Sequence, residues 1–238
     1  VFIVFGALLE GVGAGDVLIK IAFALTGKSR GGPAHAAIVA SGLFGATSGS
    51  VTANVVGTGA FTIPMIRRRG FSPEFSGAVE AAASTGGQIM PPIMGAAAFL
   101  MANLTGLPYL KIATAAALPA FFYYFSLFCA VSLEAKRVGI EPIPAADREQ
   151  ITKTDILQSF MLLGPILVIL ATLIAGRSPA MAGFWAILSA IAIALVLNPA
   201  LRANPKRILD AMIKGGVAGA QIMVAVASIG VLLAVLNL

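Results

Sequence analysis

Long uncharged stretches separated by short charged clusters dominate the sequence. They cover residues 34–66, 75–110, 112–133, 156–176 and 178–201, with a sixth from 215 to 238, and only Glu80 interrupts the second. A helix that crosses a bilayer needs about 20 mainly apolar residues. Stretches 112–133, 156–176 and 178–201 therefore each predict one membrane-spanning helix.

The stretch 34–66 is long for one crossing and short for two crossings with a loop. Basic clusters flank it at 28–30 and 67–69, and Lys and Arg concentrate on the cytoplasmic side of membrane proteins. Gly, Ser, Thr or Asn occupy more than half of positions 41–62, which weakens a continuous helix. We therefore expect a re-entrant helical hairpin with its tip near 47–52, buried in protein or lining a wet cavity.

The stretch 75–110 contains the run STGGQIMPP at 84–92. Its two prolines lack a backbone N–H and clash with the preceding turn. The run predicts a discontinuous helix with halves over about 74–87 and 92–103. A helix that is only kinked is the alternative.

Composition and charge agree with a membrane protein. Hydrophobic residues make up 58% of the chain and charged residues 11%, with a mean hydropathy of +0.95, too apolar for a soluble globule. Cytoplasmic Lys and Arg explain the net charge of +6 without nucleic-acid binding. This topology also places 134–155 and 202–214 in the cytoplasm. Segments 16–26 and 204–214 predict interfacial amphipathic helices.

Few side chains suit enzymatic chemistry, so we expect no enzyme. We interpret His35 as an interfacial loop residue and Cys129 as a small buried apolar residue. The sequence lacks metal-binding clusters and a phosphate-binding glycine motif with its lysine. Glu80 is a candidate for proton coupling. We favour a structural pair with Arg67–Arg69 instead, because Glu80 lies about two helical turns from the interface.

Neutral oxygens concentrate at the two expected helix interruptions. Carbonyls freed by broken helices, with Ser, Thr and Asn side chains, replace the hydration shell of a monovalent cation such as sodium. A divalent cation would recruit carboxylates, which are missing from the sequence near the tip. Close packing of small residues between helices gives a similar pattern, so composition leaves both interpretations open.

The run LFGATSGSVTANVVGTGAFTIPMI at 43–66 is followed by RRRGFSPEFSGAVEAAASTGGQIMPPIMGAAAFLMA at 67–102. These runs resemble the large permease subunit of TRAP (tripartite ATP-independent periplasmic) transporters, and most closely the fused permeases that work with TAXI-type receptors. An SGS hairpin tip, an acidic-Phe-x-Gly/Ala segment and a Gly-x-x-x-Pro-Pro break carry the resemblance, which covers most of the chain.

The resemblance implies an all-α polytopic membrane protein with an inverted-repeat elevator-type fold, a re-entrant hairpin and a discontinuous helix. It implies a sodium-coupled secondary transporter in a bacterial or archaeal inner membrane, importing an organic acid that a periplasmic solute-binding protein delivers. The partners would be that receptor, the lipid bilayer, the rest of the permease, and a small membrane subunit or its fused equivalent. Sodium is the coupling ion, and neither a cofactor nor nucleic acid is implied. A carrier without a binding protein, a re-entrant-loop channel and a structural membrane subunit are the alternatives.

Carried over by motif, the resemblance also implies ligands at both interruptions. The cation-binding residues would be Ser48, Gly49, Ser50, Val51, Asn54, Gly87, Met90 and Pro91, several through backbone carbonyls. The substrate-binding residues would be Thr52, Thr58, Ser84, Thr85 and Gln88. The sequence does not identify the acid.

Both ends of the sequence look cut inside apolar segments, so we expect a truncated piece of a larger permease. Residues 1–32 would hold the end of a preceding transmembrane helix and an arm helix, and 33–66 the hairpin. Residues 67–133 would hold the discontinuous helix and the next transmembrane helix, and 134–155 a cytoplasmic connector. The start of a second inverted repeat would occupy 156–238, with two transmembrane helices, an arm helix and part of a third.

Overall fold

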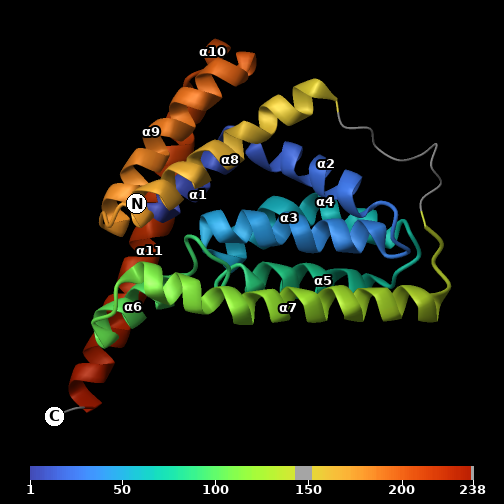
Figure 1. Cartoon of the computed structure of the whole chain (residues 1–238), viewed down its shortest axis with the longest axis horizontal. Coiled ribbons are helices and arrows are strands. Elements are labelled where there is room, and N and C mark those ends of the chain that lie inside the picture. The colour runs from blue at the N-terminus through green and yellow to red at the C-terminus, as the bar shows by residue number, and fades with distance from the viewer. Residues whose placement is uncertain (143–151, 237–238) are drawn as a thin grey trace.

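The computed structural model describes residues 1–142 and 152–236, and every regular element within these ranges is a helix (Figure 1). The first range contains α1 (Phe2–Gly11), α2 (Ala14–Thr26), α3 (Gly32–Ser48), α4 (Val51–Arg67), α5 (Pro73–Gly86), α6 (Ala96–Thr105) and α7 (Tyr109–Val138). The second contains α8 (Lys153–Ile174), α9 (Pro179–Leu197), α10 (Pro199–Ala203) and α11 (Lys206–Leu236).

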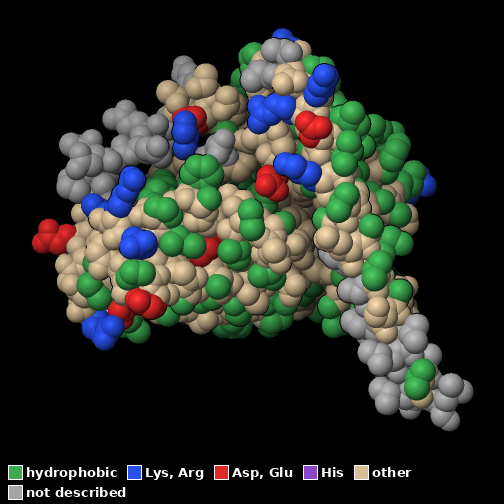
Figure 2. Space-filling view, turned by 180° about the vertical axis from the view of Figure 1, so that it is seen from behind, with side chains coloured by type: hydrophobic (Ala, Val, Ile, Leu, Met, Phe, Trp, Pro, Cys, Tyr) green, Lys and Arg blue, Asp and Glu red, His purple; other side chains and the backbone are tan. Residues whose placement is uncertain are grey.

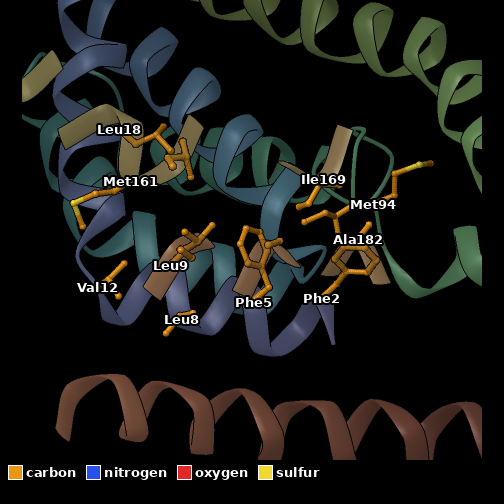
Figure 3. Packing of buried hydrophobic residues seen from close by; sticks show 14 of the residues in the cluster. Phe2, Phe5, Leu8, Leu9, Val12, Leu18, Met94, Met161, Ile169 and Ala182 are labelled. Carbon is orange, nitrogen blue, oxygen red and sulfur yellow. The ribbon is translucent and has the colours of Figure 1, made fainter. Parts of the chain in front are cut away.

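The helices form two groups that meet at α1 and α2. Helices α3, α4, α5 and α7 lie side by side, while α8 packs against α9 and α11 packs against α1 (Figure 1). Helix α1 contacts α11, α9 and α3, and α2 contacts both α3 and α8. The large apolar core therefore lies between the groups (Figure 3), with Phe5, Leu8 and Leu9 of α1 fully buried in it.

Among the residues that the structure describes, three helices are long and apolar enough to cross a membrane: Tyr109–Val138, Thr154–Ile174 and Pro179–Leu197. They correspond to the three predicted spans. Large apolar side chains on α7, including Phe121, Phe122 and Phe125, are exposed. A continuous apolar surface of this kind is rare on soluble monomers and suits contact with lipid tails. Cys129 lies on the same helix and is exposed, so the expectation that it is buried was wrong.

The broken helix resumes later than the sequence predicts. Helix α5 ends at Gly86 and α6 begins at Ala96, so the interruption covers residues 87–95. Hydrogen bonds within the interruption explain its length, because the Gly95 N–H donates to the Gln88 carbonyl at 2.7 Å. The Tyr109 hydroxyl, at the start of α7, also donates to the carbonyls of Pro92 and Ile93.

Residues 204–214 do not form a separate amphipathic helix, because α11 continues to Leu236. The pair Gly215-Gly216 fails to end this helix. One glycine inside a helix costs only about 1 kcal/mol relative to alanine. Gly215 also fits closely against α1, where an added Cβ would lie 2.6 Å from the Val4 Cα atom. Packing against α1 thus favours one continuous helix.

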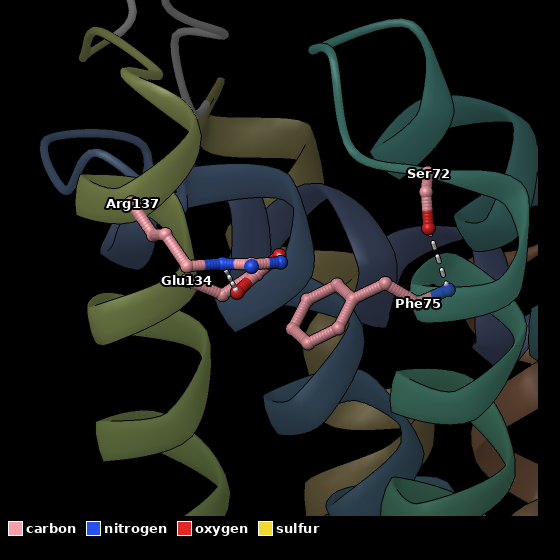
Figure 4. A network of polar contacts seen from close by, with 4 residues as sticks. All are labelled: Ser72, Phe75, Glu134 and Arg137. Atoms are coloured by element: carbon pink, nitrogen blue, oxygen red, sulfur yellow. Dashed lines mark hydrogen bonds and ion pairs between the residues drawn. The ribbon is translucent and has the colours of Figure 1, made fainter.

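Basic side chains lie toward the upper and left margins of the face shown in Figure 2. The open end of the hairpin and the end of α7 lie together, since the His35 ring near the start of α3 contacts the Ser132 hydroxyl. Near the same end, Ser72 caps α5 by accepting a hydrogen bond from the Phe75 N–H, and Arg137 makes a two-pronged ion pair with Glu134 (Figure 4). The basic residues at 28–30, 67–69 and 136–137 are therefore gathered at one end of this helix group, as the predicted topology requires.

Candidate functional site

The chain turns sharply between α3 and α4 at Gly49 and Ser50, within the range expected for the hairpin tip. Gly49 has a φ of 63°, in the left-handed region that favours glycine. Ser50 starts α4 as its N-cap, and its hydroxyl oxygen accepts a hydrogen bond from the Ala53 N–H at 3.3 Å. The hairpin tip, residues 48–51, is thus a two-residue turn between two helix ends.

The hairpin tip lies directly against the interruption between α5 and α6. A Cβ on Gly49 would lie 2.1 Å from the Met94 carbonyl oxygen, so only hydrogen fits there. A Cβ on Gly45 would lie 2.5 Å from the Gly87 Cα atom. The Ile93 N–H donates to the Ala46 carbonyl at 3.2 Å, which joins the two segments through their main chains.

Four helix ends meet at this contact. The C-terminal ends of α3 and α5 carry partial negative charge, and the N-terminal ends of α4 and α6 carry partial positive charge. The last four carbonyls of a helix have no partner within it. In α3, the Gly45 and Ala46 carbonyls accept hydrogen bonds from the Gly49 and Ile93 N–H groups, whereas those of Thr47 and Ser48 accept none from the described residues. The contact can therefore offer main-chain oxygens to a cation and N–H groups to an anion.

A cavity of about 440 Å³ opens beside the hairpin tip. Ser48 and Gly49 form part of its wall, with Ile93 and Met94 from the interruption and Phe99 from α6. Its walls are mainly apolar, and a few main-chain and hydroxyl groups face it. A site with this balance is typical of pockets for small organic molecules.

The expected ligands are only partly gathered at this cavity. Ser48 is buried at the tip, Gly87 is buried against Gly45, and Met90 and Pro91 are half-buried in the interruption. Asn54 is fully buried and crosses the hairpin, since its amide donates to the Ser41 carbonyl at 2.7 Å.

The expected substrate ligands fall into two groups. Thr52, Thr85 and Gln88 are exposed near the two interruptions. Thr58 and Ser84 are buried, and their hydroxyls contact the Glu80 carboxyl group. The structure therefore separates these two residues from the cavity and assigns them to a second polar cluster.

This second cluster surrounds Glu80, which is fully buried on α5. Its carboxyl oxygens accept hydrogen bonds from Ser41, Thr58, Thr62 and Ser84, with oxygen separations of 2.5–3.1 Å. We call these five residues the Glu80 cluster. Sequence reasoning missed its hydroxyl partners, although pairs four residues apart, 58/62 and 80/84, place them on common helix faces.

The expected ion pair between Glu80 and Arg67–Arg69 was wrong. Arg67 and Arg68 are exposed, and the buried Arg69 Nε atom has no hydrogen-bond partner in the described part of the chain. The ion pairs found among the described residues are Lys20–Asp155 and Arg137–Glu134. Glu80 points instead into the space between α3 and α4, where hydroxyls replace a cationic partner.

His35 also differs from its expected place in a loop. It lies within α3, is 3% exposed, and stacks on the Phe128 ring with centroids 4.7 Å apart. Nδ1 lies 2.7 Å from the Ser29 hydroxyl, and Nε2 lies 3.1 Å from the Ser132 hydroxyl. His35 therefore joins α3 to α7.

Comparison with known proteins decides the family. The sequence profile described as "Tripartite ATP-independent periplasmic transporter, DctM component" matches residues 1–238. The chain belongs to this family. DctM proteins are transporter permease components rather than enzymes, in agreement with the sequence prediction.

Three relatives illustrate the match. The chain is 29% identical over 180 residues to the uncharacterized protein YgiK of Salmonella typhimurium, covering 70% of this chain and 39% of YgiK. It is 28% identical over 168 residues to the sialic acid TRAP transporter permease protein SiaT of Haemophilus influenzae, covering 71% and 27%. It is 37% identical over 91 residues to the C4-dicarboxylate TRAP transporter large permease protein DctM of Vibrio cholerae, covering 38% and 20%. The DctM chain described here thus matches well under half the length of these relatives.

Proposed function

We propose that this DctM-family chain is part of the permease subunit of a sodium-coupled secondary transporter. The transporter imports an organic acid that a periplasmic solute-binding protein delivers, and it resides in a bacterial or archaeal inner membrane. The contact between the hairpin tip and the interruption at 87–95 carries this proposal. It joins four helix ends beside a cavity of about 440 Å³.

The cation would bind where main-chain oxygens converge. Its ligands would come from Ser48, Gly49, Ser50 and Val51 at the tip and from Gly87, Met90 and Pro91 in the interruption. A monovalent cation suits carbonyl and hydroxyl oxygens, whereas calcium or magnesium would recruit carboxylates. Asn54 would hold α4 against α3, since its amide is already bonded to the Ser41 carbonyl.

The substrate would lie beside the cation, where Thr52, Thr85 and Gln88 are exposed and the N-terminal ends of α4 and α6 favour an anion. Two of these relatives are named as transporters of sialic acid and of C4-dicarboxylates, which are both organic acids. The same relationship supports a periplasmic receptor and a small membrane subunit or its fused equivalent as partners. Membership of the TAXI-type branch rests on the sequence motifs alone. In the elevator mechanism, the hairpin and broken helix would move together as the transporting unit, and residues 156–236 would begin a second inverted repeat.

Uptake by the intact transport system in proteoliposomes tests this proposal. The purified receptor would be supplied with radiolabelled succinate or sialic acid, and an inward sodium gradient would be imposed. We expect accumulation that stops when choline replaces sodium or when the receptor is left out. Uptake that is independent of sodium would contradict the proposal.

Gln88→Ala adds a local test because the Gln88 side chain is exposed at the interruption and contributes little to packing. We expect a higher KM for the acid with sodium coupling retained. Gln221→Ala removes an exposed glutamine from α11 and serves as the matched control, with an unchanged KM. Equal effects of both substitutions would argue against a substrate role for Gln88.

A further inference from the structure

Glu80 is a buried carboxyl group that has no cationic partner within the described part of the chain. Its exposed fraction is 0%, and the ion pairs found among the described residues involve Asp155 and Glu134 instead. Burial of an unpaired carboxylate is strongly unfavourable, so such a group either receives several hydrogen bonds or takes up a proton. Ionisable groups inside membrane segments are rare for this reason and mark functional positions.

The Glu80 cluster provides hydrogen bonds to the carboxylate from three helices. Ser41 of α3 donates to Oε1 at 3.0 Å, Thr58 of α4 at 2.5 Å, and Ser84 of α5 at 3.1 Å. Thr62 of α4 donates to Oε2 at 2.5 Å. Donors on both oxygens stabilise the ionised form despite its burial.

The same hydroxyls also accommodate a protonated Glu80. A hydroxyl has one hydrogen and two acceptor positions. The Thr62 hydroxyl can donate to the Thr58 carbonyl at 3.1 Å, which leaves its oxygen free to accept a proton from Glu80 Oε2. Thr58 has a similar second acceptor, the Asn54 carbonyl, at 2.8 Å. Rotation of the hydroxyl hydrogens thus lets the same side chains hydrogen-bond to either the ionised or the protonated form of Glu80.

The oxygen separations fit protons better than a metal ion. Oxygen ligands lie about 2.3–2.6 Å from a hard cation such as calcium, so neighbouring ligands at right angles are about 3.3–3.7 Å apart. The separations of 2.5 Å between Glu80 and the hydroxyls of Thr58 and Thr62 are much shorter. They are hydrogen-bond distances.

Other titratable groups around the cluster have their own surroundings. The Tyr124 hydroxyl of α7 donates to the Ala83 carbonyl of α5 at 3.0 Å. His35 lies six residues before Ser41 on α3 and bonds to Ser29 and Ser132. Arg67 on α4 and Glu74 on α5 are exposed, and so is Glu10 of α1, near Gly57 of α4. Glu80 is therefore the carboxyl group that faces the hydroxyls directly.

We propose that Glu80 is a proton-binding site of the permease, which takes up and releases one proton in each transport cycle. Protonation forms one O–H bond on the carboxylate and changes its charge from −1 to 0. The proton comes from water on one side of the membrane and returns to water on the other. This inference rests on the proposed transport function and adds a proton to sodium as a coupling ion.

A chain of contacts connects this site with the hairpin tip. Thr58 contacts Glu80 and also lies 3.3 Å from the Asn54 side-chain oxygen. The Asn54 amide lies beside Gly45, where an added Cβ would be 3.0 Å away. Gly45 in turn contacts Gly87 of the interruption. A change in charge at Glu80 therefore acts on the helices that form the cation and substrate site.

Infrared difference spectroscopy of the intact permease in lipid tests the protonation directly. Spectra recorded across a pH series should show a C=O stretching band from a buried protonated carboxyl group. Glu80→Gln should remove this band, because glutamine imitates the protonated form and preserves the packing. Glu74→Gln removes an exposed carboxylate from the same helix and should leave the band in place. A wild-type protein without the band, or a Glu80→Gln protein that retains it, would overturn the proposal.

Ser84→Ala keeps the carboxyl group and removes one of its donors. Loss of this hydrogen bond should shift the frequency of the C=O stretching band of the carboxyl group. Ser126→Ala on the exposed side of α7 is the matched control, with an unchanged band frequency. An unchanged band frequency in Ser84→Ala would show that the band belongs to another group.

Uptake in proteoliposomes then tests coupling. Sodium would be equal on both sides, the membrane potential would be clamped, and the outside would be one pH unit more acidic. One co-transported proton then supports up to about tenfold accumulation of the acid. We expect accumulation by the wild type and Glu74→Gln but only equilibration by Glu80→Gln. Accumulation by Glu80→Gln would overturn the coupling role.

Sodium-driven uptake in the same vesicles, without a pH gradient, keeps the two proposals distinguishable. Loss of sodium-driven uptake by the wild type would defeat the proposed function. Wild-type uptake that responds to sodium and ignores the pH gradient would defeat only the proton role of Glu80.

Discussion

The contact between the hairpin tip and the interruption and the Glu80 cluster both involve α3, α4 and α5, but they use different atoms. At the tip, the helices are interrupted, and main-chain carbonyls and N–H groups lack helical partners. Around Glu80, the helices are continuous, so only side-chain oxygens are available. The comparison indicates that interrupted helices provide a site for a cation or an anion. Continuous helices that carry hydroxyl side chains around a carboxyl group favour a proton instead.

The largest effect should follow a change that separates the tip from the interruption. Gly45→Val places a Cβ 2.5 Å from the Gly87 Cα atom, where backbone has to move. Overpacking typically costs about 1–3 kcal/mol, and a backbone clash belongs at the upper end. We expect a strongly lowered Tm and no sodium-driven uptake.

Gly77→Ala is the control for this change, because a Cβ at Gly77 meets nothing within 4 Å. Alanine should instead stabilise α5, by about 0.5–1 kcal/mol. Thermal unfolding of both variants in detergent measures the contrast. A Gly45→Val protein with wild-type Tm would show that the two segments are not held together.

The next largest loss of stability should follow a substitution in the Glu80 cluster. Thr58→Val keeps the shape of the side chain but removes a donor to the buried carboxyl group and a partner of the Ser41 hydroxyl. A buried polar group left without a partner costs about 1–3 kcal/mol. Thr85→Val changes an exposed hydroxyl that bonds within its own helix, so its effect should stay within about 0.5 kcal/mol. Equal unfolding free energies for the two variants would argue against a role for the cluster in stability.

Substitutions of two tyrosines should cost similar stability but differ in their effect on the sodium response. The Tyr109 hydroxyl binds carbonyls of the interruption, and the Tyr123 hydroxyl binds the Ala82 carbonyl within α5. Each substitution by Phe should cost about 1 kcal/mol. Only Tyr109→Phe should also weaken the rise in Tm that sodium produces. The same loss of sodium response in Tyr123→Phe would show that the response is not specific to the interruption.

The smallest effect should come from a surface ion pair outside both sites. The Lys20 ammonium lies 3.5 Å from a carboxylate oxygen of the buried Asp155, and the Lys20 side chain is half exposed. An ion pair with a solvated partner at this distance contributes little and is screened by salt. Lys20→Gln should lower the Tm slightly at low salt and not at high salt. A large loss that persists in high salt would indicate a structural role for Lys20 beyond charge.

The sequence predicted the two interruptions because their causes are local. Gly49 and Ser50 are a turn signal between apolar helices, and Pro91-Pro92 cannot continue a helix. The later restart at Ala96 depends on hydrogen bonds from Tyr109 and within 88–95, which are tertiary contacts. The pattern of apolar and polar residues along the chain does not predict such tertiary hydrogen bonds.

The partners of Glu80 show a second feature that could not be predicted from the sequence. The basic run at 67–69 suggested a cationic partner by proximity along the chain. Three of the four hydroxyls that bind Glu80 come from two other helices, at positions up to 39 residues away. Likewise, the exposure of Cys129 and the continuity of α11 depend on which helices pack together. Periodicity alone does not determine that packing.

Sodium-dependent thermal stabilisation of the intact permease tests the cation site most directly. Two glycines in the left-handed region provide a matched pair: a Cβ at Gly49 collides with the Met94 carbonyl, and a Cβ at Gly106 meets nothing within 4 Å. Sodium at 100 times its Kd should stabilise the wild type by about 2.7 kcal/mol. We predict the same sodium-induced rise in Tm for Gly106→Ala and none for Gly49→Ala. A full rise in Gly49→Ala, or none in the wild type, would contradict a cation site between the hairpin tip and the interrupted helix.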